Sequence, residues 1–307
     1  MPSYMVRNQY KTLCSWTSVT KLNKEFTTKM ASLNIRWAFN ANQWTPTTDE
    51  ITAASSYIQQ EEKQRIAKFV FQDDAKSSLV GRLMLRKFVN EIMGIPYANI
   101  RFSRDDKGKP YLVDGGDMQV TFNVSHQGDY VVLAGNVHQS IGIDVMKIEP
   151  PANKNIPEFF RVMSRQFSTH EWSTIRSFPT EMEQIACFYR IWCLKESYVK
   201  NIGFGITVPL VDISFSLKTR KLTVGKIVTD TVLYIKNVAK EAWVFEETLL
   251  DEKHAVAVSL HLEDKGNYTP FTYTFLTFSE VVQNAQPLNE PDCNFSANFM
   301  EKQIKYF

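Results

Sequence analysis

The stretch from Tyr189 to Gly205 constrains the fold and the function of this chain more than any other. Its apolar side chains, and two just before it, recur at steps of three and four residues, which predicts an amphipathic helix: Ile185, Phe188, Tyr189 and Trp192. Glu196 and then Lys200 follow at further steps of four, so both charges continue the apolar face. Gly203 suits the C-terminal end of this helix. The two charges form either an ordinary exposed pair or part of a site.

The composition is that of an ordinary globular protein, and it narrows the classes of function. The chain has 307 residues, enough for one large domain or two smaller ones, with 44% hydrophobic and 22% charged residues. A net charge of +2 does not favour general nucleic-acid binding, and no apolar run approaches the length of a membrane span. The four cysteines lack a Cys-x-x-Cys pair, which predicts buried free thiols.

Residues 1–32 are interpreted as a separate leader. They are rich in Ser and Thr, and their basic residues outnumber the single acid Glu25: Arg7, Lys11, Lys21, Lys24 and Lys29. This composition resembles a mitochondrial transit segment, but it is more often that of a disordered leader, or of residues upstream of a functional start near Met30. We expect a disordered leader on a cytosolic protein, with mitochondrial targeting as the less favoured alternative.

The rest of the chain is predicted to form two similar halves and a tail. Each half, 33–138 and 139–262, begins with a strand, continues with helical segments and ends with several strands. That order argues for two α+β halves rather than an alternating β-α-β array. The polar stretch 263–307 is predicted to be a poorly packed tail. The strands expected after the last helix are 211–217, 221–224, 231–235, 242–246 and 255–260.

A helical pattern from Gln59 to Met93 in the first half is rich in basic residues. A break is expected near Asp73-Asp74. Most of the basic residues are interpreted as a solvated face, although a helix facing a polyanion would have the same composition: Lys63, Arg65, Lys68, Arg82, Arg86 and Lys87.

Two turns follow in the first half. The first, residues 104–110, is either a charged hairpin tip or a phosphate clamp, in which Gly108 lets the backbone approach and the Lys and Arg side chains supply charge. The second closes a hairpin whose first strand, 120–126, places Val124 and Ser125 on opposite sides. His126 ends the apolar side of that strand, where a packing role is more common than a catalytic one.

The predicted strand 140–146 carries an acid where burial is costly. Its residues alternate, so Asp144 lies opposite the core-facing side chains, on the same face as Gly142 and Met146. A carboxylate in such a strand is costly to desolvate unless it meets a cation or a metal. Asp144 is therefore the candidate partner of the charged helix.

These residues indicate magnesium-dependent phosphoryl chemistry. The sequence contains no P-loop, no nucleophile elbow and no Rossmann glycine fingerprint after a strand. Asp144 and Glu196 together could hold one hard cation, because Mg²⁺ takes one or two carboxylates plus waters and substrate phosphate oxygens. The upstream bases would hold the remaining phosphates.

Two of the segments resemble the paired motifs of the 4′-phosphopantetheinyl transferases of the surfactin-synthetase-activating type. They are Ile141-Gly142-Ile143-Asp144 and, later, Trp192-Cys193-Leu194-Lys195-Glu196-Ser197-Tyr198-Val199-Lys200. Further stretches that resemble the family are RWAF at 36–39, EEKQRIAKFVF at 61–71, GRLMLRK at 81–87, KGKP at 107–110 and NVSHQGDY at 123–130. The resemblance covers about 35–260 and implies an α+β fold of two ferredoxin-like halves related by a pseudo-twofold axis, with coenzyme A and Mg²⁺ in the cleft between them.

The resemblance also implies roles for individual residues. Asp144 and Glu196 would bind Mg²⁺, for which Mn²⁺ could substitute, and Glu196, Lys200 and His126 would be catalytic. Coenzyme A would be bound by residues of four segments: Arg65; Arg104, Asp105, Asp106, Lys107, Gly108 and Lys109; Asn123, Val124, Ser125 and His126; Glu196 and Lys200. Many family members carry a third acid two residues after the strand aspartate, where this chain has Met146. We expect a water or Gln127 to take its place.

The implied reaction transfers the 4′-phosphopantetheine arm of coenzyme A to a serine of apo acyl carrier protein domains and releases adenosine 3′,5′-bisphosphate. Carriers of fatty-acid synthase, a mitochondrial carrier and aminoadipate reductase-type proteins are expected partners, for a monomer that binds neither nucleic acid nor membranes. Two alternatives stay open. One is a coenzyme A- or carrier-binding module that has lost the chemistry, and the other is a different magnesium-dependent nucleotide enzyme with an unrelated acceptor.

Overall fold

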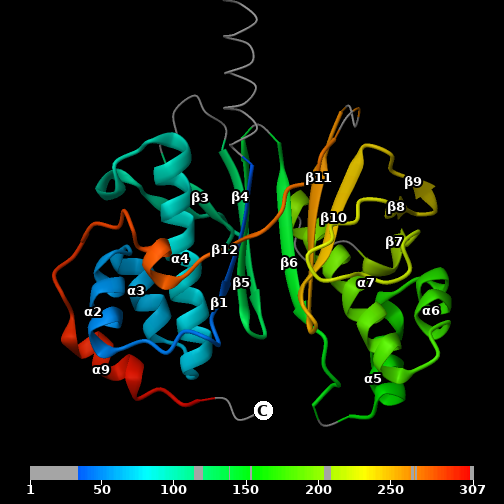
Figure 1. Cartoon of the computed structure of the whole chain (residues 1–307), viewed down its shortest axis with the longest axis horizontal. Coiled ribbons are helices and arrows are strands. Elements are labelled where there is room, and N and C mark those ends of the chain that lie inside the picture. The colour runs from blue at the N-terminus through cyan, green and yellow to red at the C-terminus, as the bar shows by residue number, and fades with distance from the viewer. Residues whose placement is uncertain are drawn as a thin grey trace, which may run out of the picture.

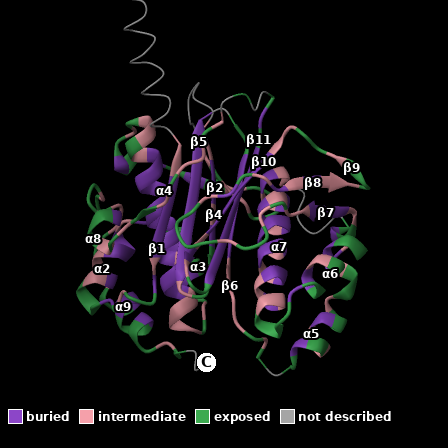
Figure 2. Ribbon diagram, turned by 45° about the vertical axis from the view of Figure 1, so that its right-hand side comes forward, coloured by how far each residue is buried: buried purple, intermediate pink, exposed green. Residues whose placement is uncertain are grey.

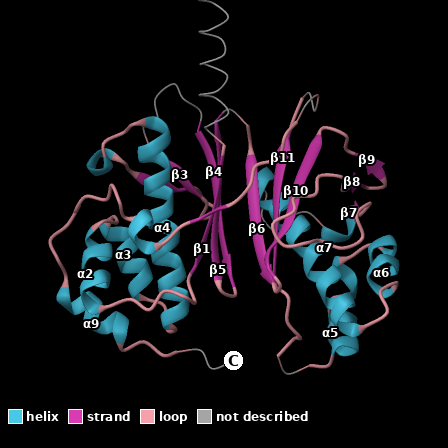
Figure 3. Ribbon diagram, in the orientation of Figure 1, coloured by secondary structure: helices cyan, strands magenta, loops and turns pink. Residues whose placement is uncertain are grey.

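The computed structural model describes residues 34–113, 120–137, 139–152, 154–203, 209–263, 266 and 268–304. The predicted leader, Cys14 and Gly205 lie outside these residues. Two sheets stand face to face at the centre of the molecule, and helices cover their outer sides (Figure 1 and Figure 3). None of the described helices is long and apolar enough to cross a membrane.

The N-terminal half contains the first central sheet, a bundle of helices and a small hairpin. Its elements in chain order are β1 (Ile35–Asn40), α2 (Thr48–Ser56), α3 (Gln60–Ala67), α4 (Gln72–Met93), η1 (Tyr97–Asn99), β2 (Phe102–Arg104), β3 (Pro110–Leu112), β4 (Val120–Gln127) and β5 (Tyr130–Val137).

The C-terminal half contains the second central sheet, its own helices and a small outer sheet, and a last segment follows it. The elements are β6 (Ile141–Lys147), α5 (Ile156–Val162), η2 (Ser164–Gln166), α6 (Thr169–Arg176), α7 (Glu181–Ile202), η4 (Leu210–Asp212), β7 (Ile213–Ser216), β8 (Val232–Ile235), β9 (Val238–Ala239), β10 (Trp243–Asp251) and β11 (His254–His261), followed by β12 (Thr274–Phe275), α8 (Phe278–Val281) and α9 (Cys293–Met300).

The two halves share one strand order. In each, three strands are antiparallel and the last of them in sequence lies in the middle: β5 lies between β1 and β4, and β11 lies between β6 and β10. In each, a long helix, α4 or α7, comes between the first strand and the second. The predicted α+β fold with two similar halves is therefore confirmed.

Strand alternation divides the core into layers. Val131 and Leu133 of β5 face the helices of the N-terminal half, whereas Val132 and Ala134 face the other sheet. Ile141, Ile143 and Val145 of β6 face back across the same apolar layer. Figure 2 shows these central strands buried between the helices. The opposite face of β6 carries Asp144 and packs against α7.

The segment after residue 263 was predicted to be a poorly packed tail, and the structure shows that this is wrong. The chain crosses from β11 to the N-terminal half, where β12 pairs in parallel with β1 (Figure 1). Phe295 and Phe299, one helical turn apart on α9, are buried in the N-terminal core. Asp292 caps α9 and pairs with Lys63 of α3 at 2.8 Å. The prediction missed α9 because the segment is polar overall and the two phenylalanines that anchor the helix lie on one face.

Some predicted boundaries were also wrong. The break in the long helical pattern lies at 68–71 rather than at Asp73-Asp74, which occupy the first turn of α4, where acids suit the helix dipole. Residues 221–224 make only isolated bridges and no strand. The helix α2 was not predicted, although Thr47 and Glu50 form a capping box that marks its start.

The basic face of the helical pattern is less solvated than predicted. Arg65 and Lys68 are exposed, but four other bases are buried: Lys63, Arg82, Arg86 and Lys87. Arg86, for example, donates to the carbonyls of Tyr97 and Ile100, at 2.7 Å and 3.3 Å. Periodicity could not reveal this burial, because the partners lie on other elements.

Of the cysteines, Cys187 and Cys193 are buried free thiols, as predicted, whereas the free thiol of Cys293 is exposed.

The packing of α9 predicts that Phe299→Ala lowers the free energy of unfolding by about 3–5 kcal/mol, the usual cost of emptying a buried phenylalanine site. Phe275 in β12 is 52% exposed, so Phe275→Ala should cost less than about 1 kcal/mol. Denaturant unfolding of both variants measures the difference. Equal costs would contradict a packed C-terminal segment.

Candidate active site

The candidate site is organised around the close approach of α7 to β6. The helix runs from a capping box at Thr180 to Gly203, whose φ of 68° ends it in the left-handed conformation, as predicted. A Cβ on Gly142 would overlap the carbonyl oxygen of Ser197 and lie 2.6 Å from the amide nitrogen of Asn201. Only glycine at this position lets the helix lie so close to the strand.

Asp144 lies two residues beyond this contact, on the α7 face of β6. Its carbonyl accepts from the Cys193 thiol at 2.9 Å, and one carboxylate oxygen, Oδ1, accepts from Lys200 Nζ at 2.6 Å. The same Oδ1 accepts from the Ser125 hydroxyl at 2.8 Å, and Lys200 Nζ also lies 2.8 Å from Ser125 Oγ. Asp144, Lys200 and Ser125 thus form a closed group built from both halves of the chain.

The second carboxylate of the site, Glu196, is half-buried one helical turn before Lys200. Burial raises its pKa, the negative charge of Asp144 raises it further, and the ammonium group of Lys200 opposes this effect. A cation between Asp144 and Glu196 would relieve the repulsion that raises the pKa of Glu196.

The residues present fit a divalent cation. Asp144 is 4% exposed, and its other oxygen, Oδ2, is buried without a hydrogen-bond partner. A buried, unsatisfied carboxylate oxygen is costly, and Mg²⁺ prefers oxygen ligands of this kind. In the part of the chain that the structure describes, no group of three or more His, Cys, Asp or Glu side chains could hold a metal. Asp144 and Glu196 could supply two ligands for such a cation, with waters or substrate oxygens as the others.

The structure does not support Gln127 as the replacement for a third acid. Its side-chain oxygen accepts the backbone N–H of Lys147, which ties the edge strand β4 to the edge strand β6. Met146, which shares the Asp144 face, is half-buried against the C-terminal core. Of the two replacements expected for the missing third acid, Gln127 and a water, only the water remains.

The basic hairpin between β2 and β3 reaches from the N-terminal half to the end of α7. Lys107 Nζ donates to the Gly203 carbonyl at 2.8 Å, and Lys109 Nζ to the Lys200 carbonyl at 3.3 Å. Cations suit this end of a helix because its carbonyl groups carry partial negative charge. The turn is therefore close to the site, as the phosphate-clamp interpretation requires.

Other residues of the hairpin shape it rather than face a ligand. The Asp105 carboxylate accepts the backbone N–H groups of Lys107 and Lys109, at 3.0 Å and 2.8 Å, and Gly108 has a φ of 82°. Asp106 is exposed. A coenzyme A contact by either aspartate stays a prediction.

Arg104 belongs to a cluster of three arginines that the sequence did not reveal. Its guanidinium donates to the Gly108 carbonyl at 2.6 Å. Burial and the charges of Arg82 and Arg65 lower its pKa to about 10, with Glu62 opposing them. Arg82, which is buried, lies 3.6 Å from Glu62. Three guanidinium groups around one carboxylate leave surplus positive charge, which an anionic ligand would neutralise. Arg82 was assigned to a solvated face because its spacing from Arg65 gave no sign of the cluster.

The predicted hairpin residues on β4 divide between its faces. Asn123 accepts the backbone N–H of Ile143 at 3.4 Å, so it joins the two halves, as Ser125 does. Val124 packs against the N-terminal core. His126 is exposed and by strand alternation lies on the Val124 side. Its predicted role at the phosphates stays a prediction.

A buried ion pair holds the turn of α7 that carries Glu196, and the sequence did not point to it. Lys195 and Glu171 of α6 have side chains 0% exposed, with 3.0 Å between Nζ and Oε2. Lys195 also donates to the Leu210 carbonyl at 2.8 Å, and Glu171 accepts the Phe215 N–H at 3.1 Å. The pair fastens α7 to α6 and β7, and thereby fixes the helix beside Glu196.

Comparison with known families agrees with this geometry. The N-terminal region model of the 4′-phosphopantetheinyl transferases matches residues 42–138, and the model of the 4′-phosphopantetheinyl transferase superfamily matches residues 140–259. The chain therefore belongs to the 4′-phosphopantetheinyl transferase superfamily, whose members modify carrier protein domains with an arm taken from coenzyme A.

Individual relatives are similar over most of the chain in animals and over about half of it in a bacterium. The L-aminoadipate-semialdehyde dehydrogenase-phosphopantetheinyl transferase of Xenopus laevis is 39% identical over 88% of this chain and 93% of its own length. The human protein of the same name is 41% identical over 85% of this chain and 89% of its own length. The 4′-phosphopantetheinyl transferase Sfp of Bacillus subtilis is 32% identical over 53% of this chain and 67% of its own length. An inactive binding module is not favoured.

The contact at Gly142 predicts that Gly142→Ala lowers the free energy of unfolding by about 1–3 kcal/mol and reduces transferase activity, because α7 must move off β6. Gly81 in α4 is the matched control. A Cβ there would lie 3.5 Å from the nearest atom, so Gly81→Ala should stabilise by about 0.5–1 kcal/mol. Denaturant unfolding and an activity assay test both. A neutral Gly142→Ala variant would contradict the helix–strand contact as the basis of the site.

Proposed function

We propose that this site transfers the 4′-phosphopantetheine arm of coenzyme A to the hydroxyl of a carrier-domain serine, with Mg²⁺ held by Asp144 and Glu196. The observation that carries the proposal is the group formed by Asp144, Lys200 and Ser125, with Glu196 beside it and the basic hairpin above it. It brings two carboxylates and several cations together at one place, as a metal-bound pyrophosphate requires.

Each side chain has a distinct role in this proposal. The serine oxygen attacks the phosphorus that bears the pantetheine arm, its proton passes to Glu196 directly or through a water molecule, and the bond to the departing adenosine 3′,5′-bisphosphate breaks. Lys200 moves from Asp144 to the pyrophosphate and offsets the charge of the leaving group. Mg²⁺, when bound, neutralises developing charge on the phosphate oxygens. Burial and the negative charge of Asp144 raise the pKa of Glu196 above its ordinary value, and a raised pKa makes a carboxylate a stronger proton acceptor.

The substrate is positioned by the basic residues of the N-terminal half. Arg104, Arg65 and Arg82 supply surplus positive charge for a phosphate of coenzyme A. Lys107 and Lys109 lie at the end of α7, next to Lys200. Bound phosphate oxygens would replace the helix carbonyls as their acceptors.

The carriers, the compartment and the oligomeric state belong to the same proposal. The names of the animal relatives include an aminoadipate-semialdehyde dehydrogenase. We propose that a monomeric cytosolic protein serves carrier domains of that type, of fatty-acid synthase and of a mitochondrial carrier. Modification of each purified apo carrier, followed by intact-mass measurement, tests them one by one.

The role of Glu196 is tested with an apo acyl carrier protein, coenzyme A and Mg²⁺. Mass spectrometry should show one phosphopantetheine on the carrier serine, and Glu196→Gln should slow the reaction by about 100-fold or more because the base is lost. Glu181→Gln, an exposed glutamate at the start of the same helix, should leave the rate unchanged. Full activity of the Glu196→Gln variant would refute its role, and competition by ATP equal to that by coenzyme A would favour a different nucleotide enzyme.

The missing third acid gives a test of the metal site. Met146→Glu places a third carboxylate on the Asp144 face, so less Mg²⁺ should be needed for half-maximal activity. Met146→Gln, which has similar size but no charge, is the control and should not show this gain. Activity is measured over a magnesium titration after treatment with a chelator. A Met146→Glu variant that needs as much Mg²⁺ as the Met146→Gln variant would argue against a metal at Asp144.

A further inference from the structure

The free protein already holds a positive charge beside the proposed metal ligands. Lys200 Nζ lies 2.6 Å from Asp144 Oδ1, and it lies 2.8 Å from Ser125 Oγ, which donates to the same carboxylate oxygen at 2.8 Å. A carboxylate oxygen and a hydroxyl oxygen are donors of the kind that a hard cation prefers. Because the ammonium group of lysine is a compact point charge, Lys200 satisfies Asp144 in the way that a bound cation would.

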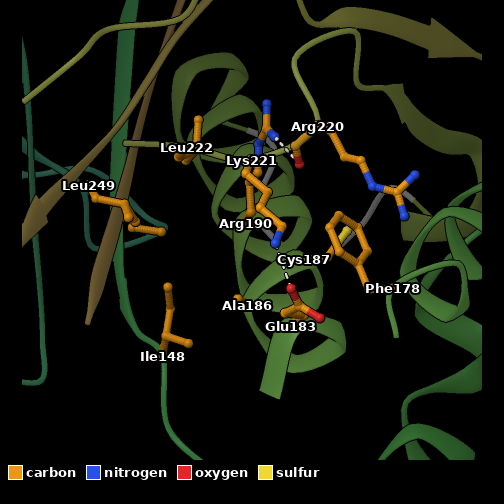
Figure 4. Close-up of a pocket in the computed structure, with 11 residues that line it drawn as sticks. Ile148, Phe178, Glu183, Ala186, Cys187, Arg190, Arg220, Lys221, Leu222 and Leu249 are labelled. Carbon is orange, nitrogen blue, oxygen red and sulfur yellow. Dashed lines mark hydrogen bonds and ion pairs between the residues drawn. The ribbon is translucent and has the colours of Figure 1, made fainter. Parts of the chain in front are cut away.

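An ordinary ion pair at the other end of α7 makes the contrast clear. Lys221 Nζ lies 2.5 Å from the carboxylate of Glu183 in the first turn of the helix (Figure 4). The Lys221 side chain is 61% exposed, and exposed pairs of this kind contribute little. The Asp144 side chain is only 6% exposed, so water screens the charge of Lys200 much less there. A divalent cation that approaches Asp144 and Glu196 therefore meets a strong repulsion from Lys200.

The side chain of Lys200 can move while the helix that carries it stays in place. The next residue, Asn201, donates to the Ser259 carbonyl at 2.8 Å and holds this turn of α7 on the sheet. The lysine side chain, in contrast, is a flexible four-carbon stem that is partly exposed. Lys109 Nζ of the basic hairpin lies 3.3 Å from the Lys200 carbonyl. A phosphate bound by this hairpin lies near the same turn of helix and attracts the ammonium group away from Asp144.

Given the proposed transferase function, on which this inference rests, we propose that Lys200 keeps divalent cations from binding at Asp144 in the free protein. The phosphates of coenzyme A remove this obstacle, because they draw the ammonium group away from the carboxylate. The free protein then binds the cation weakly and binds it tightly once the phosphates are in place. By linkage, the cation raises the affinity for coenzyme A by the same factor. The protein thus takes up the metal together with its substrate rather than before it.

Binding of Mn²⁺ to the full chain without coenzyme A, followed by electron paramagnetic resonance of the free ion, tests the role of Lys200. Lys200→Met and Lys200→Gln remove the charge, so each should bind Mn²⁺ about tenfold more tightly than the unaltered protein. Lys200→Arg keeps the charge and should bind no more tightly. Lys221→Met, which breaks the exposed pair, and Lys109→Met, which removes the neighbouring ammonium group, should change the affinity by less than about twofold. A melting transition establishes that each variant is folded. Unchanged Mn²⁺ affinity in both neutral variants would overturn the proposal.

The same titrations with saturating coenzyme A and no carrier protein measure the coupling to the substrate. Coenzyme A should tighten Mn²⁺ binding by a factor about ten times larger in the unaltered protein than in Lys200→Gln, because only the unaltered protein has a charge to displace. Equal factors would overturn the proposal.

A second substitution separates this proposal from the proposed function. Asp144→Asn in the Lys200→Gln protein should abolish the tight binding of Mn²⁺. If the double variant binds Mn²⁺ as tightly as Lys200→Gln does, the cation does not lie at Asp144, and the proposed metal site fails together with the role of Lys200. If Mn²⁺ binding in the presence of coenzyme A requires Asp144 but does not respond to Lys200→Gln, only the role of Lys200 is overturned.

Discussion

The site depends on one packing contact, the seating of α7 on β6 at Gly142. Because Gly142 has no side chain, the Ser197 carbonyl lies close to the sheet. It accepts the hydroxyl of Ser259, which is next to Gly142 on the neighbouring strand β11, at 2.8 Å. Asn201 donates to the Ser259 carbonyl at 2.8 Å and fixes the same stretch of helix. Asp144 then meets Lys200 without intervening water, and Glu196 lies one turn away. Backbone packing thus places the two carboxylates, together with the ion pair of Lys195 with Glu171 and the contacts of Asp144 with Lys200 and Ser125.

The charged groups of the site do not fully satisfy one another within the protein, and a bound ligand would complete their interactions. Asp144 has Lys200 on one oxygen and no partner on the other, and Glu196 resists ionisation because of burial and of Asp144. A bound cation would favour the ionised form of Glu196 and release Lys200 from Asp144. An anionic substrate would in turn accept Lys200 and the neighbouring hairpin lysines. Binding of the cation and of the phosphates should therefore be mutually favourable.

The sequence predicted the parts of this site that depend on periodicity and failed where partners come from distant elements. Steps of four residues predicted the helix that carries Glu196 and Lys200. The two-residue alternation of the strand predicted that Asp144 lies on the face opposite the core, where this helix can meet it. The buried state of Arg82 and the pair of Lys195 with Glu171 did not, because burial of a base depends on which carboxylate or carbonyl the fold brings to it. The packed C-terminal segment was missed for a similar reason, because its apolar side chains are buried in the core of the N-terminal half.

The site is shared between the halves, so its geometry depends on what holds them together. Ser125 and the hairpin lysines come from one half, and Asp144 and Lys200 come from the other. Away from the site, Arg36 of β1 meets Glu246 of β10 at 2.6 Å, with both side chains buried. The Tyr268 hydroxyl, in the segment that returns to the N-terminal half, donates to Glu246 at 2.5 Å. A buried pair with such partners stabilises little relative to apolar packing, but breaking it leaves an unpaired charge. Such a pair therefore favours one orientation of the halves over its alternatives, and a site assembled from both halves requires that orientation.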